Sequence, residues 1–149
     1  MTLSLIDGLP VVKVRIGHSD AWRELCDRNL EPVPPDITVN ALIDTGASIT
    51  VLDAALVRRL GLRDRGVCRV RGFDGSLHAD PATREYFNYD ISLSIPGAEG
   101  GVVVRVGDLQ VVGAPLSCAA YDMLLGLDVL RHCTLTLRLA ESMLEITAA

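Results

Sequence analysis

The feature that most constrains the fold is a strict alternation of side chains over residues 87–95. Apolar side chains stand at every second position, and Asn, Asp and Ser fill the positions between them. This period of two is typical of a strand that buries one face and exposes the other. Hydrophobic residues form 49% of the chain but aromatic residues only 4%, so the core must be built from Val, Leu, Ile and Ala, a composition that favours strands. The pattern predicts a mostly β structure.

Further strands are expected at short intervals. Segments with suitable patterns lie at residues 11–16, 37–43, 49–52, 67–73, 76–79, 102–106, 109–112, 133–139 and 144–146. Two short helices are predicted between them, at residues 21–29 after Ser19 or Asp20, and at residues 53–61 with Asp53 as N-cap and Gly61 as the closing residue. Since 149 residues suit one domain, we expect a single closed or sandwiched β domain over residues 1–149.

Charge and cysteine placement exclude several classes of partner. The formal net charge of −5 argues against nucleic-acid binding, which needs a basic face. No run approaches the roughly 18 apolar residues of a membrane span, and no signal peptide is recognised, so we expect a cytoplasmic protein without a membrane segment. The cysteines are scattered and form no C-x-x-C pair, which predicts reduced thiols, no metal and no cofactor. They are Cys26, Cys68, Cys118 and Cys133.

One segment carries recognisable chemistry. Residues 41–51 read Ala-Leu-Ile-Asp-Thr-Gly-Ala-Ser-Ile-Thr-Val, so that a carboxylate, Asp44, follows an expected buried strand and is followed at once by Thr45 and Gly46. An Asp-Thr-Gly tripeptide by itself is also ordinary turn chemistry. Here it is flanked by apolar residues, and an apolar-apolar-Gly run, Leu124-Leu125-Gly126, follows later in the chain.

In this order the two segments resemble those of the retropepsin-like aspartic proteases, the single-lobed relatives of retroviral proteases, and in particular a bacterial-like member. The resemblance covers residues 10–146. It implies a mostly β, single-lobed, closed β-barrel-like acid-protease fold with one or two short helices, acting as a homodimer. The stretch at residues 17–36 is longer than the compact viral pattern and has no assigned role.

The resemblance implies an aspartic endopeptidase that hydrolyses extended peptide or protein substrates. Each subunit of the homodimer would contribute Asp44 to a symmetric pair that activates a water molecule, without metal or cofactor. Thr45 would tie the two loops together, and Gly46 would let backbone approach the partner carboxylate and the substrate. Ala47 and Ser48, with Gly46, would line the substrate groove.

Other segments would support or cover this loop. By the same resemblance, Thr50 would pack beneath it, and a buried strand would brace it through Leu124, Leu125 and Gly126. An Asp-Gly pair between extended runs indicates a hairpin. This hairpin, residues 72–76, would form the flap, with Phe73, Asp74 and Gly75 over the substrate.

The sequence also departs from the viral pattern. Leu127 stands where many retroviral members carry Arg after the glycine, so the internal salt bridge of those relatives is missing or is remade by Arg131 with Asp128. Two functions remain open: an active endopeptidase, or a non-catalytic dimerisation or peptide-binding module that has kept the fold.

Overall fold

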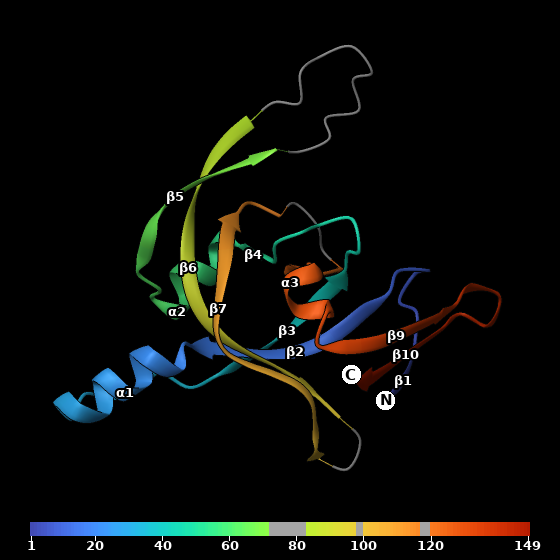
Figure 1. Ribbon diagram of the computed structural model, residues 1–149, viewed down its shortest axis with the longest axis horizontal. Coiled ribbons are helices and arrows are strands. Elements are labelled where there is room, and N and C mark those ends of the chain that lie inside the picture. Colours follow the sequence, from blue (N-terminus) through green and yellow to red (C-terminus); the bar gives the residue numbers. More distant parts are fainter. Residues whose placement is uncertain (72–82, 98–99, 117–119) are drawn as a thin grey trace.

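The computed structural model describes residues 1–71, 83–97, 100–116 and 120–149. Its larger sheet has the strand order β2-β3-β8-β4-β7-β6-β5, and an additional pairing of β2 with β6 closes the first six strands into a barrel (Figure 1). The strands are β2 (Val11–His18), β3 (Ile37–Ile43), β4 (Val51–Asp53), β5 (Asp64–Arg71), β6 (Thr83–Pro96), β7 (Val102–Ala114) and β8 (Met123–Leu125). The predicted closed, mostly β fold is confirmed.

A second, three-stranded sheet joins the two ends of the described chain. It has the order β1-β10-β9, from β1 (Thr2–Ser4), β9 (Cys133–Arg138) and β10 (Met143–Ala148), and all its pairings are antiparallel. A short 3-10 turn, η2 (Leu139–Glu141), connects β9 to β10. In Figure 1 this sheet lies at one end of the long axis, and the helix of the 17–36 insert lies at the other.

The described residues include three helices beside the barrel. Helix α1 (Asp20–Asn29) is capped by the Ser19 side chain, and α2 (Ala54–Leu60) by Asp53, with Gly61 closing α2 in the left-handed conformation as predicted. Helix α3 (Leu127–Leu130) follows β8 directly. None of the helices described here is long and apolar enough to cross a membrane.

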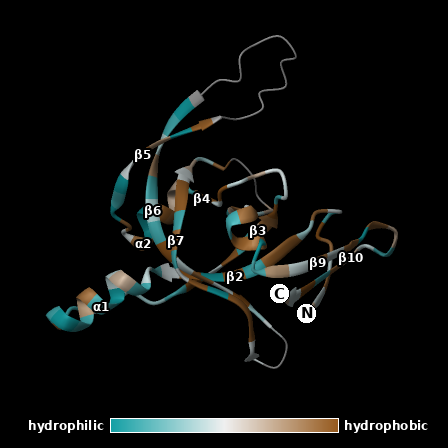
Figure 2. Cartoon of the chain, viewed as in Figure 1, coloured by the Kyte–Doolittle hydropathy of each residue, from teal (hydrophilic) through white to brown (hydrophobic). Residues whose placement is uncertain are grey.

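Aliphatic side chains of the strands and of α2 and α3 form the core. Figure 2 shows brown, hydrophobic segments on the central strands, whereas much of α1 is teal. Ile91, Leu93 and Ile95 on β6 are at most 1% exposed, as the alternation predicts. The pattern fails at Phe87, which is 51% exposed. There β6 extends past the barrel, and Phe87 pairs with the exposed Val67 and with Gly113, which has no side chain to cover it.

The two strands expected at residues 102–106 and 109–112 are one continuous strand, β7. The pattern predicts a break at Gly107 and Asp108, but a register shift opposite Ile91–Leu93 absorbs the extra residue in a bulge. The strand β1 was not predicted, because three residues carry too little pattern. Phe73, Asp74 and Gly75, and with them the expected flap hairpin at residues 72–76, lie outside the described residues.

Candidate active site

Asp44 follows the last residue of β3, in a tight turn fixed by the backbone. Its N–H donates to the carbonyl of Leu125 on β8 at 3.0 Å, continuing the parallel pairing of the two strands. The carboxylate Oδ1 accepts from the N–H of Gly46 at 2.9 Å, and the carbonyl of Asp44 accepts from the N–H of Ala47 at 3.2 Å. Within the described residues Oδ2 makes no hydrogen bond, so one oxygen orients the half-buried carboxylate and the other is available for chemistry.

The glycine in this turn has a local reason. A Cβ at Gly46 would lie 3.2 Å from Oδ1 of Asp44, tighter than an ordinary contact. Thr45, Gly46 and Ser48 are exposed, and Ala47 is half-buried. The loop therefore exposes its side chains to solvent, while hydrogen bonds to buried groups hold its backbone.

That backing is a polar cluster of Thr50, Gly126 and Asp128. The Thr50 hydroxyl donates to Oδ1 of Asp128 at 2.7 Å and accepts from the N–H of Gly126 at 3.1 Å, and the Thr50 N–H donates to Oδ2 of Asp128 at 2.9 Å. Thr50 is fully buried. Since each buried polar atom here has a partner, the outgoing end of the loop is fixed to the start of α3.

Gly126 is required by close backbone approach. A Cβ on it would lie 2.6 Å from the carbonyl carbon of Ile49. The next N–H, of Leu127, donates to the carbonyl of Ala47 at 2.8 Å. Leu125 is fully buried and Leu124 half-buried, so residues 124–126 lie beside the loop as the sequence suggested.

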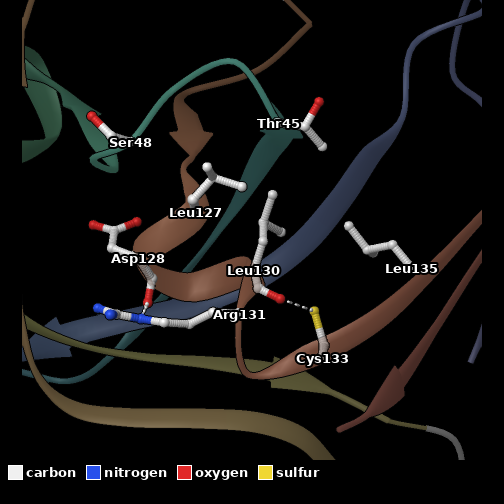
Figure 3. Close-up of a pocket in the computed structure, with 8 residues that line it drawn as sticks. All are labelled: Thr45, Ser48, Leu127, Asp128, Leu130, Arg131, Cys133 and Leu135. Atoms are coloured by element: carbon white, nitrogen blue, oxygen red, sulfur yellow. Dashed lines mark hydrogen bonds between the residues drawn. The ribbon is translucent and has the colours of Figure 1, made fainter.

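A pocket of about 510 Å³ opens beside the loop (Figure 3). Its lining is largely apolar and comes from the loop, α3 and β9; the residues are Thr45, Ser48, Leu127, Asp128, Leu130, Arg131, Cys133 and Leu135. Asp44 is not among them. Burial raises the pKa of the Cys133 thiol, whose sulfur lies 3.3 Å from the carbonyl of Leu130, so this thiol stays protonated at neutral pH.

The expected pairing of Arg131 with the Asp128 carboxylate is wrong. The Arg131 Nε donates to the backbone carbonyl of Asp128 at 3.0 Å, while the carboxylate is already occupied by Thr50. By sequence, Asp128 is connected only with Arg131 and not with the Asp44 loop. Its place two residues after Gly126, facing a threonine that follows the Asp-Thr-Gly turn, is the signal that could have assigned it to the loop.

Whether the described side chains could form a metal-binding site depends on how they are grouped. Over the described residues, no group of three or more His, Cys, Asp or Glu side chains could hold a metal ion. Cys26, Cys68 and Cys133, the cysteines that are described, form no disulfide.

Comparison with known proteins gives one family and one fold. A family model described as aspartyl protease matches residues 35–129, which include the loop and the Gly126 segment. A retropepsin-like aspartic protease from Rickettsia conorii aligns with a TM-score of 0.58 at 15% identity, covering 100% of this chain and 91% of that one. No curated protein sequence matches the chain.

Two further structures align less closely. The EIAV protease complexed with the inhibitor HBY-793 has a TM-score of 0.43 at 22% identity, over 83% of this chain and 86% of that chain. The retroviral protease-like domain of Ddi1 from Leishmania major has a TM-score of 0.40 at 14% identity, over 93% and 94%.

Proposed function

Because the chain belongs to the aspartyl protease family, as a retropepsin-like member and an aspartic endopeptidase, we propose that its catalytic group is a pair of Asp44 carboxylates, one from each of two identical chains. The observation that carries the proposal is the Asp44 turn itself. One carboxylate oxygen is fixed by Gly46, the other has no partner within the described residues, and the loop backbone is pinned by Leu125 and Thr50.

The mechanism follows from the chemistry of two close carboxylates. They cannot both be ionised cheaply in a low-dielectric site, so the pair shares one proton. The ionised member takes a proton from a bound water, which attacks the peptide carbonyl, while the protonated member donates to the carbonyl oxygen. Apparent pKa values then belong to the pair, not to one chain.

In this proposal a second chain supplies the other carboxylate, because the 149 residues hold a single Asp-Thr-Gly. The pocket beside Thr45 supports this part of the proposal, because it is apolar and continues into exposed side chains: Leu127 is 48% exposed and Ile49 45%. Such a patch next to a catalytic loop is suited to cover by a two-fold partner. Thr45, whose hydroxyl has no hydrogen bond within the described residues, would then bond across the interface.

The substrate would be an extended peptide segment lying along the loop. Gly46, Ala47 and Ser48 would contact it from below, and the segment at residues 72–76, with Phe73, Asp74 and Gly75, would cover it by strand addition. Thr50, Leu124, Leu125 and Gly126 would act only by holding the loop.

The test is cleavage of a mixed peptide library by the wild type and by Asp44→Asn. Asn keeps an oxygen for the Gly46 N–H, so the fold should survive while cleavage falls below detection. Asp27→Asn, on the exposed face of α1, is the matched control and should cleave as the wild type does. Undiminished cleavage by pure Asp44→Asn would overturn the assignment, and a folded wild type that cleaves nothing would favour the non-catalytic module.

A further inference from the structure

The insert at residues 17–36 is fastened to the barrel by charged side chains. Asp36 pairs with Arg23 of α1 and, at 3.3 Å, with Arg15 of β2. Asp20, the first residue of α1, pairs with Arg105 of β7 at 2.6 Å. The helix therefore rests on the outer face of β2 and β7, at a place where three guanidinium groups meet two carboxylates.

Strand register brings two of these arginines onto one row. Arg15 of β2 is opposite Ser94 of β6, and Ser94 is opposite Arg105 of β7. Directly opposed side chains on one face have Cβ atoms about 5 Å apart, so Arg15 and Arg105 leave the sheet on either side of Ser94, and all three residues line one pocket. Two residues along, Ser92 is opposite Gly17, where any Cβ would overlap the Asp36 carboxylate. The small residues Ser92, Ser94 and Gly17 thus leave space between the arginine side chains.

A pocket of about 110 Å³ lies between these groups. Its charged lining consists of Arg15, Arg23, Arg105 and the single carboxylate of Asp36, and the serines Ser92 and Ser94 complete its polar wall. Within the lining three guanidinium groups stand against one carboxylate, while Asp20 and Asp108 act on Arg105 from outside the lining.

Several hydrogen-bond donors of the residues that line this pocket are unused within the described part of the chain. Among the described residues Arg15 and Arg105 each use one N–H, and their side chains are 59% and 57% exposed. The hydroxyls of Ser92 and Ser94 make no hydrogen bond within the described part, although Ser92 is only 7% exposed. An arginine has five N–H donors, so most of this capacity is available to a ligand.

We propose that this pocket binds a small tetrahedral oxyanion of the phosphate class, which joins the insert to the barrel. Guanidinium forks match phosphate oxygens in pairs, and charge-assisted hydrogen bonds of this kind are among the strong ones. A planar carboxylate would engage one fork, whereas donors from β2, β6, β7 and α1 approach from several sides and suit a tetrahedral ion. The bound anion also offsets the repulsion between the three guanidinium groups.

The test is a phosphate titration of the full chain by calorimetry and thermal unfolding, at ionic strength held constant with chloride. The wild type should bind saturably and melt at higher temperature with phosphate. Arg15→Gln and Arg105→Gln should each weaken binding by about tenfold or more, the value of one charge-assisted hydrogen bond. Arg69→Gln is the matched control, because it removes an exposed arginine–carboxylate pair on β5; its affinity should equal that of the wild type.

A second variant keeps the test decisive if the arginine variants unfold. Ser94→Glu places a carboxylate between Arg15 and Arg105, and should raise the melting temperature without phosphate and abolish the response to it. Phosphoserine distinguishes a free from an esterified phosphate: binding of either anion supports the site. No saturable binding of either to the wild type, an equal loss in Arg69→Gln, or wild-type binding by Ser94→Glu would overturn the proposal.

Discussion

Asp128 illustrates how one residue outside the Asp44-Thr45-Gly46 turn can hold the chain that follows it. Its carboxylate receives both the N–H and the hydroxyl of Thr50 and also, at 2.9 Å, the N–H of Val129 at the start of α3. Because the Thr50 hydroxyl gives its proton to Asp128, its lone pair is directed to the N–H of Gly126. The arrangement of hydrogen bonds in this cluster therefore depends on an acceptor side chain at position 128.

Asp128→Ala should reduce catalysis more than substrate binding. It leaves the buried Thr50 N–H without a partner, which costs about 1–3 kcal/mol of unfolding free energy. The displaced loop should lower kcat by about tenfold to a hundredfold with little change in KM, since small errors in position are expensive for catalysis. Steady-state kinetics and urea unfolding check this, and Asp128→Asn, which keeps one acceptor oxygen, should recover part of both losses. A kcat equal to that of the wild type would contradict the role.

Leu30 is a second residue whose effect comes from the backbone. It ends α1 in the left-handed conformation, with φ of 56°, and its side chain is 92% exposed. Leu30→Gly should therefore stabilise the fold by about 0.5–1 kcal/mol, because glycine adopts this φ without strain and no burial is lost. Leu25→Gly, inside the same helix, should destabilise by about 1 kcal/mol. Chemical denaturation measures both, and a loss of stability in Leu30→Gly would show that the cap is not strained.

At the scale of elements, His18 joins three of them. It ends β2, stacks on Trp22 of α1 with ring centroids 3.9 Å apart, and shares a hydrogen bond of 2.9 Å with the carbonyl of Leu60 at the end of α2. Burial lowers the pKa of His18; the bond to Leu60 opposes this, Arg23 adds to it and Asp36 opposes it. The folded protein thus favours neutral His18.

Stability should consequently fall on the acid side of neutrality. Below the unfolded-state pKa of about 6.5, the unfolded chain takes up a proton that folded His18 does not, so stability decreases until the pH reaches the lowered folded-state pKa. His18→Gln, whose amide can still donate to Leu60, should remove this part of the pH dependence. Urea unfolding from about pH 5 to 8 provides the measurement, with exposed His132→Gln as the control; parallel profiles for the wild type and His18→Gln would disprove the linkage.

Elements were predictable where local chemistry decides them. The two ends of α2 were predictable from Asp53 and Gly61, because cap residues act within one turn of the helix. The alternation of apolar and polar residues located the buried part of β6. The bulge at Gly107 was not predictable from the local sequence, because it is defined by the pairing of β7 with β6. For the same reason the sequence pairs Asp128 with Arg131 and not with Thr50, which is distant from it in the chain.

At the scale of the whole molecule, one chain supplies a single Asp44 carboxylate, and the proposed dimer would bring two of them together. The strand β8 and the cluster of Thr50, Gly126 and Asp128 hold the Asp44 loop. Thr45, Leu127 and Ile49 beside it remain exposed. In an isologous dimer the same patch faces itself, so both active-site halves and their apolar surroundings are covered together. Loss of one Asp44 should then inactivate the whole dimer.

Subunit mixing tests this dependence directly. If wild type and Asp44→Asn exchange freely at equal amounts and fixed total concentration, only dimers with two intact carboxylates cleave, so activity should fall to about one quarter. A site completed within one chain would give about one half. The control is mixing with Asp27→Asn, which supplies an intact Asp44 and should leave activity unchanged. Specific activity should also fall on dilution, because dissociation separates the carboxylates. A linear decline with the wild-type fraction would place the complete site in a single chain.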